Sequence, residues 1–415
     1  MNRNRSGWFF VSGMLAVLML PGAVGAGEGR PPARFIVSAG RYERTDTPVT
    51  AELEKSNLAG RVHLVEVKGN ERITVPCQFE MTVPARLSWI LSGTTAANAE
   101  RVFELWPGEE KAEARTGLKQ DEKALEVRFG ENPILSYNYA VIPPPPGKDK
   151  LYERSGFIHP LRSASGVVLT QIHVPDHIHH MGLWNAWTST EFEGRHVDFW
   201  NLKDGKGTVR FVKFADKAEG PVYASFKAAQ DHVDLSAPGG EKIALHEIQE
   251  VRVWNVGGPG KYWLIDIVST QKCASSSPLK LPPYRYGGIG FRAISEWDKG
   301  NSNYLTSEGK DRTNGHATRA KWCLAYGETS KGPAGIEFMS HPQNREHPEP
   351  MRLWPEGPIF FNFCPVQKTE WVLEPGKEYV LRYRLCVYDG RMTAEQAERL
   401  WRDFGEAPKV SVAAP

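Results

Sequence analysis

The sequence lacks closely spaced cysteines. Its five cysteines are widely separated, and no C-x-x-C pair occurs among them. This spacing argues against a thiolate zinc site and against a thioredoxin-like redox motif. Because the number is odd, at least one cysteine must stay unpaired within a monomer, even in a compartment that permits disulfides.

Several functional motifs are missing as well, and the positive and negative charges nearly balance. No G-x-S-x-G, Walker-type phosphate loop or H-E-x-x-H motif occurs, which argues against the common serine hydrolases, nucleotide-binding proteins and zincin proteases. Lys and Arg total 51 against 49 Asp and Glu, and the first 26 residues contain two of the bases, Arg3 and Arg5, and no acid. Without a basic field to attract them, nucleic acid and anionic lipid are not expected partners.

Apolar runs long enough to cross a bilayer are absent after the N-terminus. Residues 1–26 read as a signal peptide, because Arg3 and Arg5 precede an apolar run over residues 8–20 and small residues follow at 24–26. An uncleaved anchor is the alternative, since the run has about the length of a marginal span. We expect cleavage, which predicts an exported protein, periplasmic or extracellular, with no stable membrane span.

Glycine, proline and tryptophan, in contrast, are plentiful, with 39, 30 and 13 residues. They favour many short strands joined by turns. Residues 33–118 are predicted to form an N-terminal β-sandwich-like domain and residues 124–405 the main domain. Only the end reads as helix, where Thr393 and Gln396 form a capping-box pattern. The predicted fold is all-β, a large antiparallel β-sandwich with a small N-terminal β domain and a C-terminal helix.

Histidine is concentrated in one part of the chain. Six of the twelve histidines lie between residues 159 and 196, and one stretch reads Asp176-His177-Ile-His179-His180. In a strand His177 and His179 point to the same face, whereas a helical turn brings His177 and His180 together. Either geometry places two imidazoles about a ligand's width apart. We therefore predict His177, His179 and His180 as a catalytic or metal centre.

Three interpretations of this cluster remain open. The histidines could hold one divalent metal ion, or one of them could act as a general acid or base oriented by Asp176 or Asp198, or they could fix a loop through hydrogen bonds. For the acid/base interpretation we assign Asp198 as the orienting acid. Trp184 and Trp200 follow closely, and we expect them to stack on a sugar ring.

Two further segments supply candidate substrate contacts. Residues 286–292 carry three glycines in a strand pattern, which marks a bulge or a close approach of backbone to ligand. Arg292 ends this run, and its forked donors suit a carboxylate or sugar hydroxyls. We interpret Arg285 as a surface ion-pair residue. His341 and Asn344 belong to a proline-fixed loop, and this fits a ligand contact as well as an ordinary turn.

Several separated motifs together resemble one known family. They are Glu153-Arg-Ser-Gly-Phe-Ile-His-Pro-Leu161, Asp176-His-Ile-His-His-Met-Gly-Leu-Trp184, Asp198-Phe-Trp200, Tyr286-Gly-Gly-Ile-Gly-Phe-Arg292 and His341-Pro-x-Asn344 with His347-Pro348. Over residues 124–405 the chain resembles the bacterial PmoA-like family of unknown function, often labelled methane oxygenase PmoA. The family has proline and arginine where this chain has Ile178 and Met181. The resemblance implies a galactose-mutarotase-like supersandwich and carbohydrate chemistry.

The residues and the resemblance together lead to one function hypothesis. We expect an exported carbohydrate-active enzyme of the hydrolase, lyase or epimerase type, acting on a glycoside or modified sugar by His/Asp acid-base chemistry, with or without a metal ion. A non-catalytic carbohydrate-binding protein is the first alternative. A metal-dependent oxidoreductase, as the family label implies, is the second.

Overall fold

The computed structural model describes residues 33–53, 62–108, 115–256 and 262–413. The expected signal peptide, residues 1–26, lies outside the described residues. Among those described, no helix is long and apolar enough to cross a bilayer. All five cysteines fall in the described part and carry free thiols.

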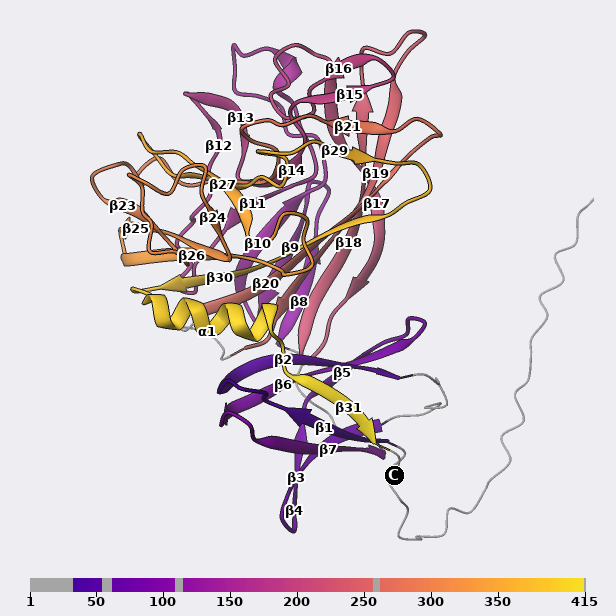
Figure 1. Ribbon diagram of the computed structural model, residues 1–415, viewed down its shortest axis with the longest axis vertical. Helices are drawn as coiled ribbons and strands as arrows, with labels where there is room; N and C mark the ends of the chain where they lie inside the picture. The colour runs from indigo at the N-terminus through magenta and orange to yellow at the C-terminus, as the bar shows by residue number, and fades with distance from the viewer. Residues whose placement is uncertain (1–32, 54–61, 109–114, 257–261, 414–415) are drawn as a thin grey trace, which may run out of the picture.

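The expected fold class is confirmed. The described chain is built almost entirely of strands, every ladder between named strands is antiparallel, and one α-helix, α1 (Ala394–Gly405), lies near the C-terminal end (Figure 1). Two large sheets form the main body, and a smaller pair of sheets lies below it. Helix α1 lies where the two parts meet.

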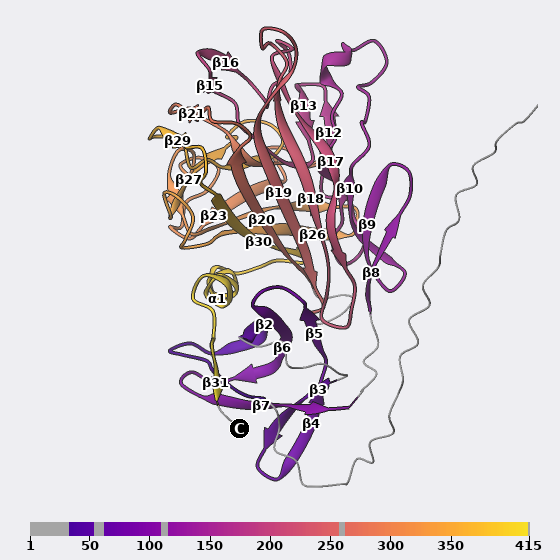
Figure 2. The same ribbon diagram turned by 90° about the vertical axis from the view of Figure 1, so that its right-hand side faces the viewer.

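One large sheet of the main body has eight strands, most of them long, and Figure 2 shows several of these running side by side. Its order is β17 (Gly207–Ala218), β18 (Tyr223–Asp234), β19 (Lys242–Trp254), β20 (Tyr262–Cys273), β30 (Tyr379–Asp389), β26 (Gly332–Ser340), β25 (Trp322–Thr329) and β23 (Ser302–Thr306).

The facing sheet has nine shorter strands, and it carries the strands that surround the histidine cluster. Its order is β24 (Arg319–Ala320), β27 (Glu349–Leu353), β28 (Phe360–Phe363), β22 (Gly288–Arg292), β14 (Leu183–Ala186), β11 (Phe157–Leu161), β10 (Asn132–Asn138), β9 (Ala124–Phe129) and β8 (Thr116–Gln120). A four-stranded sheet of β16 (Arg195–Val197), β15 (Thr190–Phe192), β21 (Leu279–Leu281) and β29 (Trp371–Leu373) adjoins it, and η1 (Lys150–Tyr152) is a 3₁₀ turn.

Aromatic side chains fill the space between the two large sheets. The ring of Tyr137 from β10 lies 4.9 Å from that of Phe226 on β18, and Phe338 of β26 stacks on Phe361 of β28 at 4.3 Å. Such contacts join strands that are far apart in sequence, and burial of the rings contributes most of the packing free energy here. The core of the sandwich therefore holds the nine-stranded sheet, and the site on it, in place.

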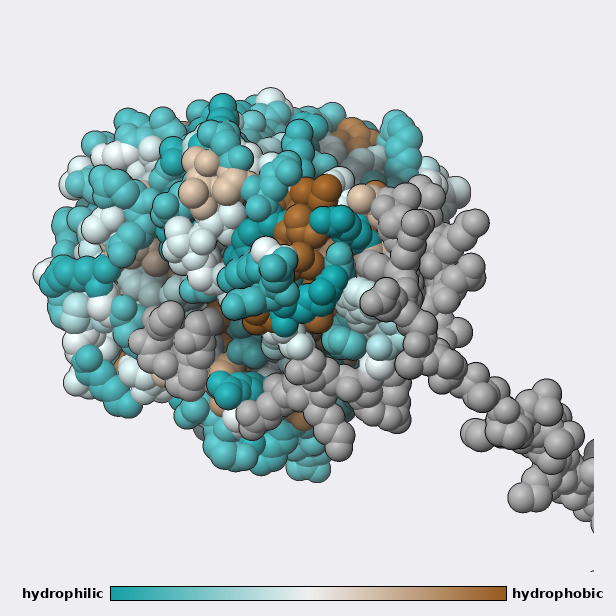
Figure 3. All heavy atoms as spheres, turned by 90° about the horizontal axis from the view of Figure 1, so that it is seen from below, coloured by the Kyte–Doolittle hydropathy of each residue, from teal (hydrophilic) through white to brown (hydrophobic). Residues whose placement is uncertain are grey.

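A second, smaller sandwich forms the lower part of the molecule. Its sheets are β31 (Lys409–Ala413), β1 (Ala33–Ser38), β7 (Glu100–Pro107), β3 (Val62–Lys68) and β4 (Glu71–Val75), and β2 (Arg44–Leu53), β6 (Ala85–Thr95) and β5 (Cys77–Glu80). Trp89 is its central side chain, between Phe35 and Phe103. Seen from below, this unit is largely hydrophilic, with small hydrophobic groups (Figure 3).

The boundaries of the two units differ from the predicted ones at both ends. The expected N-terminal unit ran to residue 118, but β8 pairs with β9 in the nine-stranded sheet. The last strand, β31, pairs with β1 and so belongs to the N-terminal unit, although it lies beyond residue 405. Neither segment was predicted as a strand, and a single sequence does not reveal which distant strand each one joins.

Candidate functional site

The three clustered histidines lie on β13 (His177–Met181), which forms a two-stranded hairpin with β12 (Ile172–Val174). The ring of His177 is stacked 4.6 Å from that of His180, and the His179 ring lies 5.7 Å from His177 and 4.8 Å from His180. The ladder of this hairpin is irregular, with a register shift between Ile172 and Val174. All three predicted imidazoles therefore meet.

A cavity of about 150 Å³ opens beside these rings. Its walls come from β13, from β22, β27 and β28 of the nine-stranded sheet, and from the loops next to them. The lining residues are His177, His179, His180, Arg285, Tyr286, Arg292, Arg352, Trp354 and Phe360. This volume is below the roughly 300–1,000 Å³ of sites for drug-sized ligands, so the cavity suits one small ring or substituent.

Asp176 connects His177 to Arg292. One carboxylate oxygen lies 2.9 Å from Nδ1 of His177, and Nη2 of Arg292 lies 2.8 Å from both oxygens. Partial burial alone would raise the pKa of Asp176, but the hydrogen bond from His177 and the charge of Arg292 outweigh it and lower that pKa. Asp176 is therefore an ionised partner that fixes the orientation of the His177 ring.

Burial keeps the other two imidazoles neutral. It lowers the pKa of His179 to about 3, assisted by the nearby charges of His177 and Arg154. Burial, with the neighbouring His179, also holds the pKa of His180 well below its usual range. At neutral pH both rings can accept a hydrogen bond, and both are in the form that binds metals. Yet the described chain contains no group of three or more His, Cys, Asp and Glu side chains placed to hold a metal ion.

The predicted aromatic contacts lie behind the cavity instead of lining it. Trp184 and Trp200 are 1% and 0% exposed, and their rings are 4.7 Å apart. Trp184 lies 5.2 Å from the His180 ring, so the pair supports the cluster from the core side. Burial to this degree leaves no face of either ring open to a ligand. The aromatic residues that do line the cavity are Tyr286, Trp354 and Phe360.

The carboxylate of Asp198 is engaged elsewhere. It accepts hydrogen bonds from the backbone N–H groups of Trp200 and Asn201, at 2.8 and 2.9 Å, and from the Asn201 side chain. These are the contacts of an Asx turn, which shapes the loop after β16. No described contact joins Asp198 to a histidine of the cluster. Asp176 takes the orienting position that we had assigned to Asp198.

His341 and Asn344 do not line the cavity either. Asn344 is buried, where its amide donates to Glu349 at 2.9 Å and its carbonyl accepts from the backbone of Arg382 at 2.7 Å. The ring of His341 packs 5.0 Å from Phe404 of α1. Both residues hold their loop against β30 and α1. Of the predicted substrate contacts, only Arg292 lines the cavity.

Of the three arginines that line the cavity, sequence reasoning missed Arg352 and gave Arg285 another role. Arg352 lies on β27 and stacks on Trp354 at 5.1 Å. The available signal was an arginine inside the apolar run Met351-Arg-Leu-Trp354, where a charged residue calls for a partner. Arg285, which we interpreted as an ion-pair residue, has no carboxylate partner among the described residues and stacks on Tyr286 at 5.4 Å.

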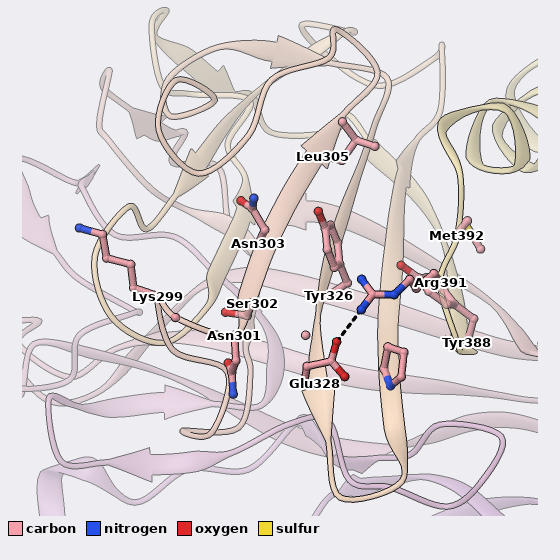
Figure 4. Close-up of a pocket in the computed structure, with 14 residues that line it drawn as sticks. Lys299, Asn301, Ser302, Asn303, Leu305, Tyr326, Glu328, Tyr388, Arg391 and Met392 are labelled. Carbon is pink, nitrogen blue, oxygen red and sulfur yellow. Dashed lines mark hydrogen bonds and ion pairs between the residues drawn. The ribbon is translucent and has the colours of Figure 1, made fainter.

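A larger cavity, about 560 Å³, lies among β23, β25, β26 and β30. Figure 4 shows Tyr326, Tyr388 and several polar side chains around it, with Arg391 and Glu328 joined by a 2.8 Å ion pair. None of its lining atoms is a buried side-chain nitrogen or oxygen without a partner, whereas His180 and Arg292 of the histidine cavity each present such atoms. The unsatisfied groups point to the smaller cavity as the binding site.

Comparison with known proteins gives a family and no activity. A sequence-family model described as "Family of unknown function (DUF6807)" matches residues 124–402. This match overturns the resemblance to the PmoA-like family, although its bounds nearly coincide with the expected 124–405. No curated protein matches the chain.

Two of the solved structures that share a distant likeness with this chain are forms of one protein. They are the heparan sulfate lyase HepC from Pedobacter heparinus and a mutant of it, both at 10% identity, with TM-scores of 0.31 and 0.32. Each alignment covers 69% of this chain and 38% of that one. At these scores the likeness supports no argument about fold or activity.

Proposed function

The chain belongs to the DUF6807 family of unknown function, and we propose that it is an exported carbohydrate-active enzyme that uses His177 as a general base or acid. The observation that carries this proposal is the Asp176–His177 pair at the edge of the cavity. An imidazole held by a carboxylate at one nitrogen, with a cavity beside it, is the arrangement that acid/base catalysis requires.

The contact with Asp176 fixes which nitrogen of His177 is reactive. When Nδ1–H donates to the carboxylate, Nε2 carries the free lone pair and can take a proton from a hydroxyl or an activated C–H group. The negative charge of Asp176 then stabilises the imidazolium that forms. Arg292 holds Asp176 from the other side at 2.8 Å, so the acid is itself oriented.

The rest of the cavity fits a hydroxylated ligand. His179 and His180 are neutral and can exchange hydrogen bonds with hydroxyl groups. Tyr286 and Trp354 offer aromatic surface, which suits the apolar face of a sugar ring. These groups support a carbohydrate as the substrate class. The proposed route needs proton transfer only. Metal analysis of the purified protein tests whether a metal ion assists it.

A paired substitution tests the acid/base role. A screen of glycans for new products identifies the substrate. His177→Gln should lower the turnover of that substrate by about 10²–10⁴-fold, since proton transfer contributes that much. His246→Gln is the matched control, because His246 also pairs through Nδ1 with a carboxylate, Asp231 at 2.7 Å, but on the exposed surface of β19. It should retain full activity.

Two results would count against the enzyme. Saturable glycan binding without any product would favour a non-catalytic binding protein. Undiminished turnover in a folded His177→Gln protein would remove His177 from the reaction. Metal content measured by mass spectrometry, before and after His179→Ala, decides whether the cluster also holds an ion.

A further inference from the structure

The walls of the histidine cavity carry an excess of positive charge. Arg285, Arg292 and Arg352 all line it, and no acidic residue does. The nearest carboxylate, Asp176, pairs with Arg292. With the imidazoles of His179 and His180 neutral, three guanidinium groups face one carboxylate around a small space.

Arg292 is the most deeply buried of the three arginines. Its side chain is 1% exposed, and Nη2 reaches Asp176, but Nε and Nη1 are buried without a hydrogen-bond partner. A buried donor left unsatisfied costs free energy, and the cost is larger for a charged group. Nδ1 of His180, on the same cavity, is also buried and unpartnered. Unsatisfied groups in one small cavity point to a ligand that completes them.

Arg285 and Arg352 lack carboxylate partners altogether among the described residues. Arg352 contacts Nε2 of His316 at 3.1 Å and stacks on Trp354. Arg285 stacks on Tyr284 and Tyr286, at 5.9 and 5.4 Å. Burial, then repulsion by Arg285, lowers the pKa of Arg352. Two like charges held close, on aromatic supports and without a counterion from the chain, are typical of an anion-binding site.

We propose that the histidine cavity recognises an anionic group of its ligand, a carboxylate, sulfate or phosphate borne by a sugar, through Arg285, Arg292 and Arg352. This rests on the proposed function only for the sugar; the charge follows from the guanidinium groups themselves. Nε and Nη1 of Arg292 have no partner in the protein, and Arg285 and Arg352 line the same cavity. The ligand class is therefore a sugar that bears a carboxylate, sulfate or phosphate group, in preference to a neutral sugar.

Binding assays without turnover test the charge preference. The probes are D-glucuronate, D-glucose 6-sulfate, D-glucose 6-phosphate and neutral D-glucose, with sulfate, phosphate and acetate as fragments, by calorimetry at constant ionic strength. At least one anionic probe should bind about tenfold or more tightly than glucose. Which of the three chemistries binds best identifies the group.

Substitutions locate the binding. Arg352→Gln and Arg285→Gln should each weaken the best anionic probe by about tenfold or more and leave glucose unchanged. Arg391→Gln removes a positive charge from the larger cavity (Figure 4) and should change neither. Thermal unfolding confirms that each variant is folded. If one of the two cavity variants fails to fold, the other still tests the inference.

The outcomes separate this inference from the proposed enzyme. If every anionic probe binds no better than glucose, or if both cavity variants bind anions as the parent does, the inference is overturned. Product formed from a neutral glycan, with no anion binding, would overturn it while leaving the acid/base proposal intact. Anion binding without any product would support this inference and count against the acid/base proposal.

Discussion

The histidines of this chain differ in burial, and burial shifts the pKa of several of them. Burial lowers the pKa of His179 to about 3 and those of His159 and His341 to about 4, in each case with positive neighbours adding to the effect. His246 pairs with Asp231 at the exposed surface instead. One residue type therefore supplies neutral acceptors in the cavity and a hydrogen-bond partner of a carboxylate at the surface.

The depressed pKa of His179 predicts acid sensitivity. The unfolded ring has a pKa near 6.5 and takes up a proton below that pH, but the folded ring does so only near 3, so acid favours the unfolded state. Above about pH 6.5 the ring contributes no pH dependence. Between pH 6.5 and 5 it should remove up to ~2 kcal/mol of stability. Urea unfolding at both pH values should show this loss reduced in His179→Gln; an identical loss would contradict the burial argument.

Strand β22 shows what glycine does at the element scale. A Cβ on Gly290 would lie 2.5 Å from the Trp200 ring and 3.3 Å from that of Trp184. The glycine run was expected to mark a bulge or an approach to ligand, and the close neighbour is in fact a core tryptophan. Absence of a side chain lets the two tryptophans pack against β22 behind the histidines.

The turn between β13 and β14 offers a test of backbone packing. Gly182 has φ +67°, and a Cβ there would lie 2.5 Å from the carbonyl oxygen of Ile158. Gly194 has φ +76° and open space around it. Both Ala variants suffer the positive-φ penalty, but Gly182→Ala must also displace β11. It should lose about 1–3 kcal/mol more than Gly194→Ala in chemical denaturation, and equal losses would remove the packing explanation.

Local patterns predicted the long strands better than the short ones, and the strand partners poorly. The apolar patterns over residues 243–253 and 262–268 predict β19 and β20, whereas short strands such as β15 and β21 were not predicted. The Thr393–Gln396 capping box marks the start of α1 as observed. The histidine cluster followed from adjacency in sequence. Arg352 reached the cavity through the pairing of β27 with β28 and of β28 with β22. Pairing across such separations depends on the packing of the whole sandwich, which a single sequence does not display.

Asp176 illustrates the same limit at the site. Two acids, Asp176 and Asp198, lay near the histidines in sequence, and either could have oriented a ring. Turn geometry decided between them, because Asp198 folds back on the backbone of Trp200 and Asn201. A nearby acid is thus a candidate until the local hydrogen bonds are known.

At the scale of the whole molecule, the C-terminal segment joins the two units. Helix α1 packs against β25 and β26 of the main body and against β2 of the small sandwich. Arg44 of β2 is 2% exposed, and its guanidinium donates to the carbonyl oxygens of Arg402 and Glu406 and to the carboxylate of Asp403. Burial raises the pKa of Asp403 in spite of this pairing. The junction therefore depends on one buried, fully engaged arginine.

Removal of that arginine should affect the whole fold. Arg44→Ala removes the ion pair with buried Asp403 and the hydrogen bonds to the two backbone carbonyl groups, leaving Asp403 a longer contact with Arg399 at 3.4 Å. Loss of one member of a buried ion pair costs roughly 3–5 kcal/mol. Arg41→Ala is the matched control, because Arg41 pairs with Glu406 near the same junction but is 71% exposed. The control should scarcely change the midpoint of thermal unfolding. A comparable midpoint shift in both variants would contradict the assigned role of Arg44.

The pairing of β1 with β31 also sets how the molecule carries load. Arg34 lies opposite Ala413 in an antiparallel ladder, so the beginning and the end of the described chain meet at one end of that ladder. A pull between residues 33 and 413 would strain its hydrogen bonds one pair at a time, because they lie across the strands. The edge strand β31 would peel away first, and tension would next reach α1 and the Arg44 junction before it reached the histidine cavity.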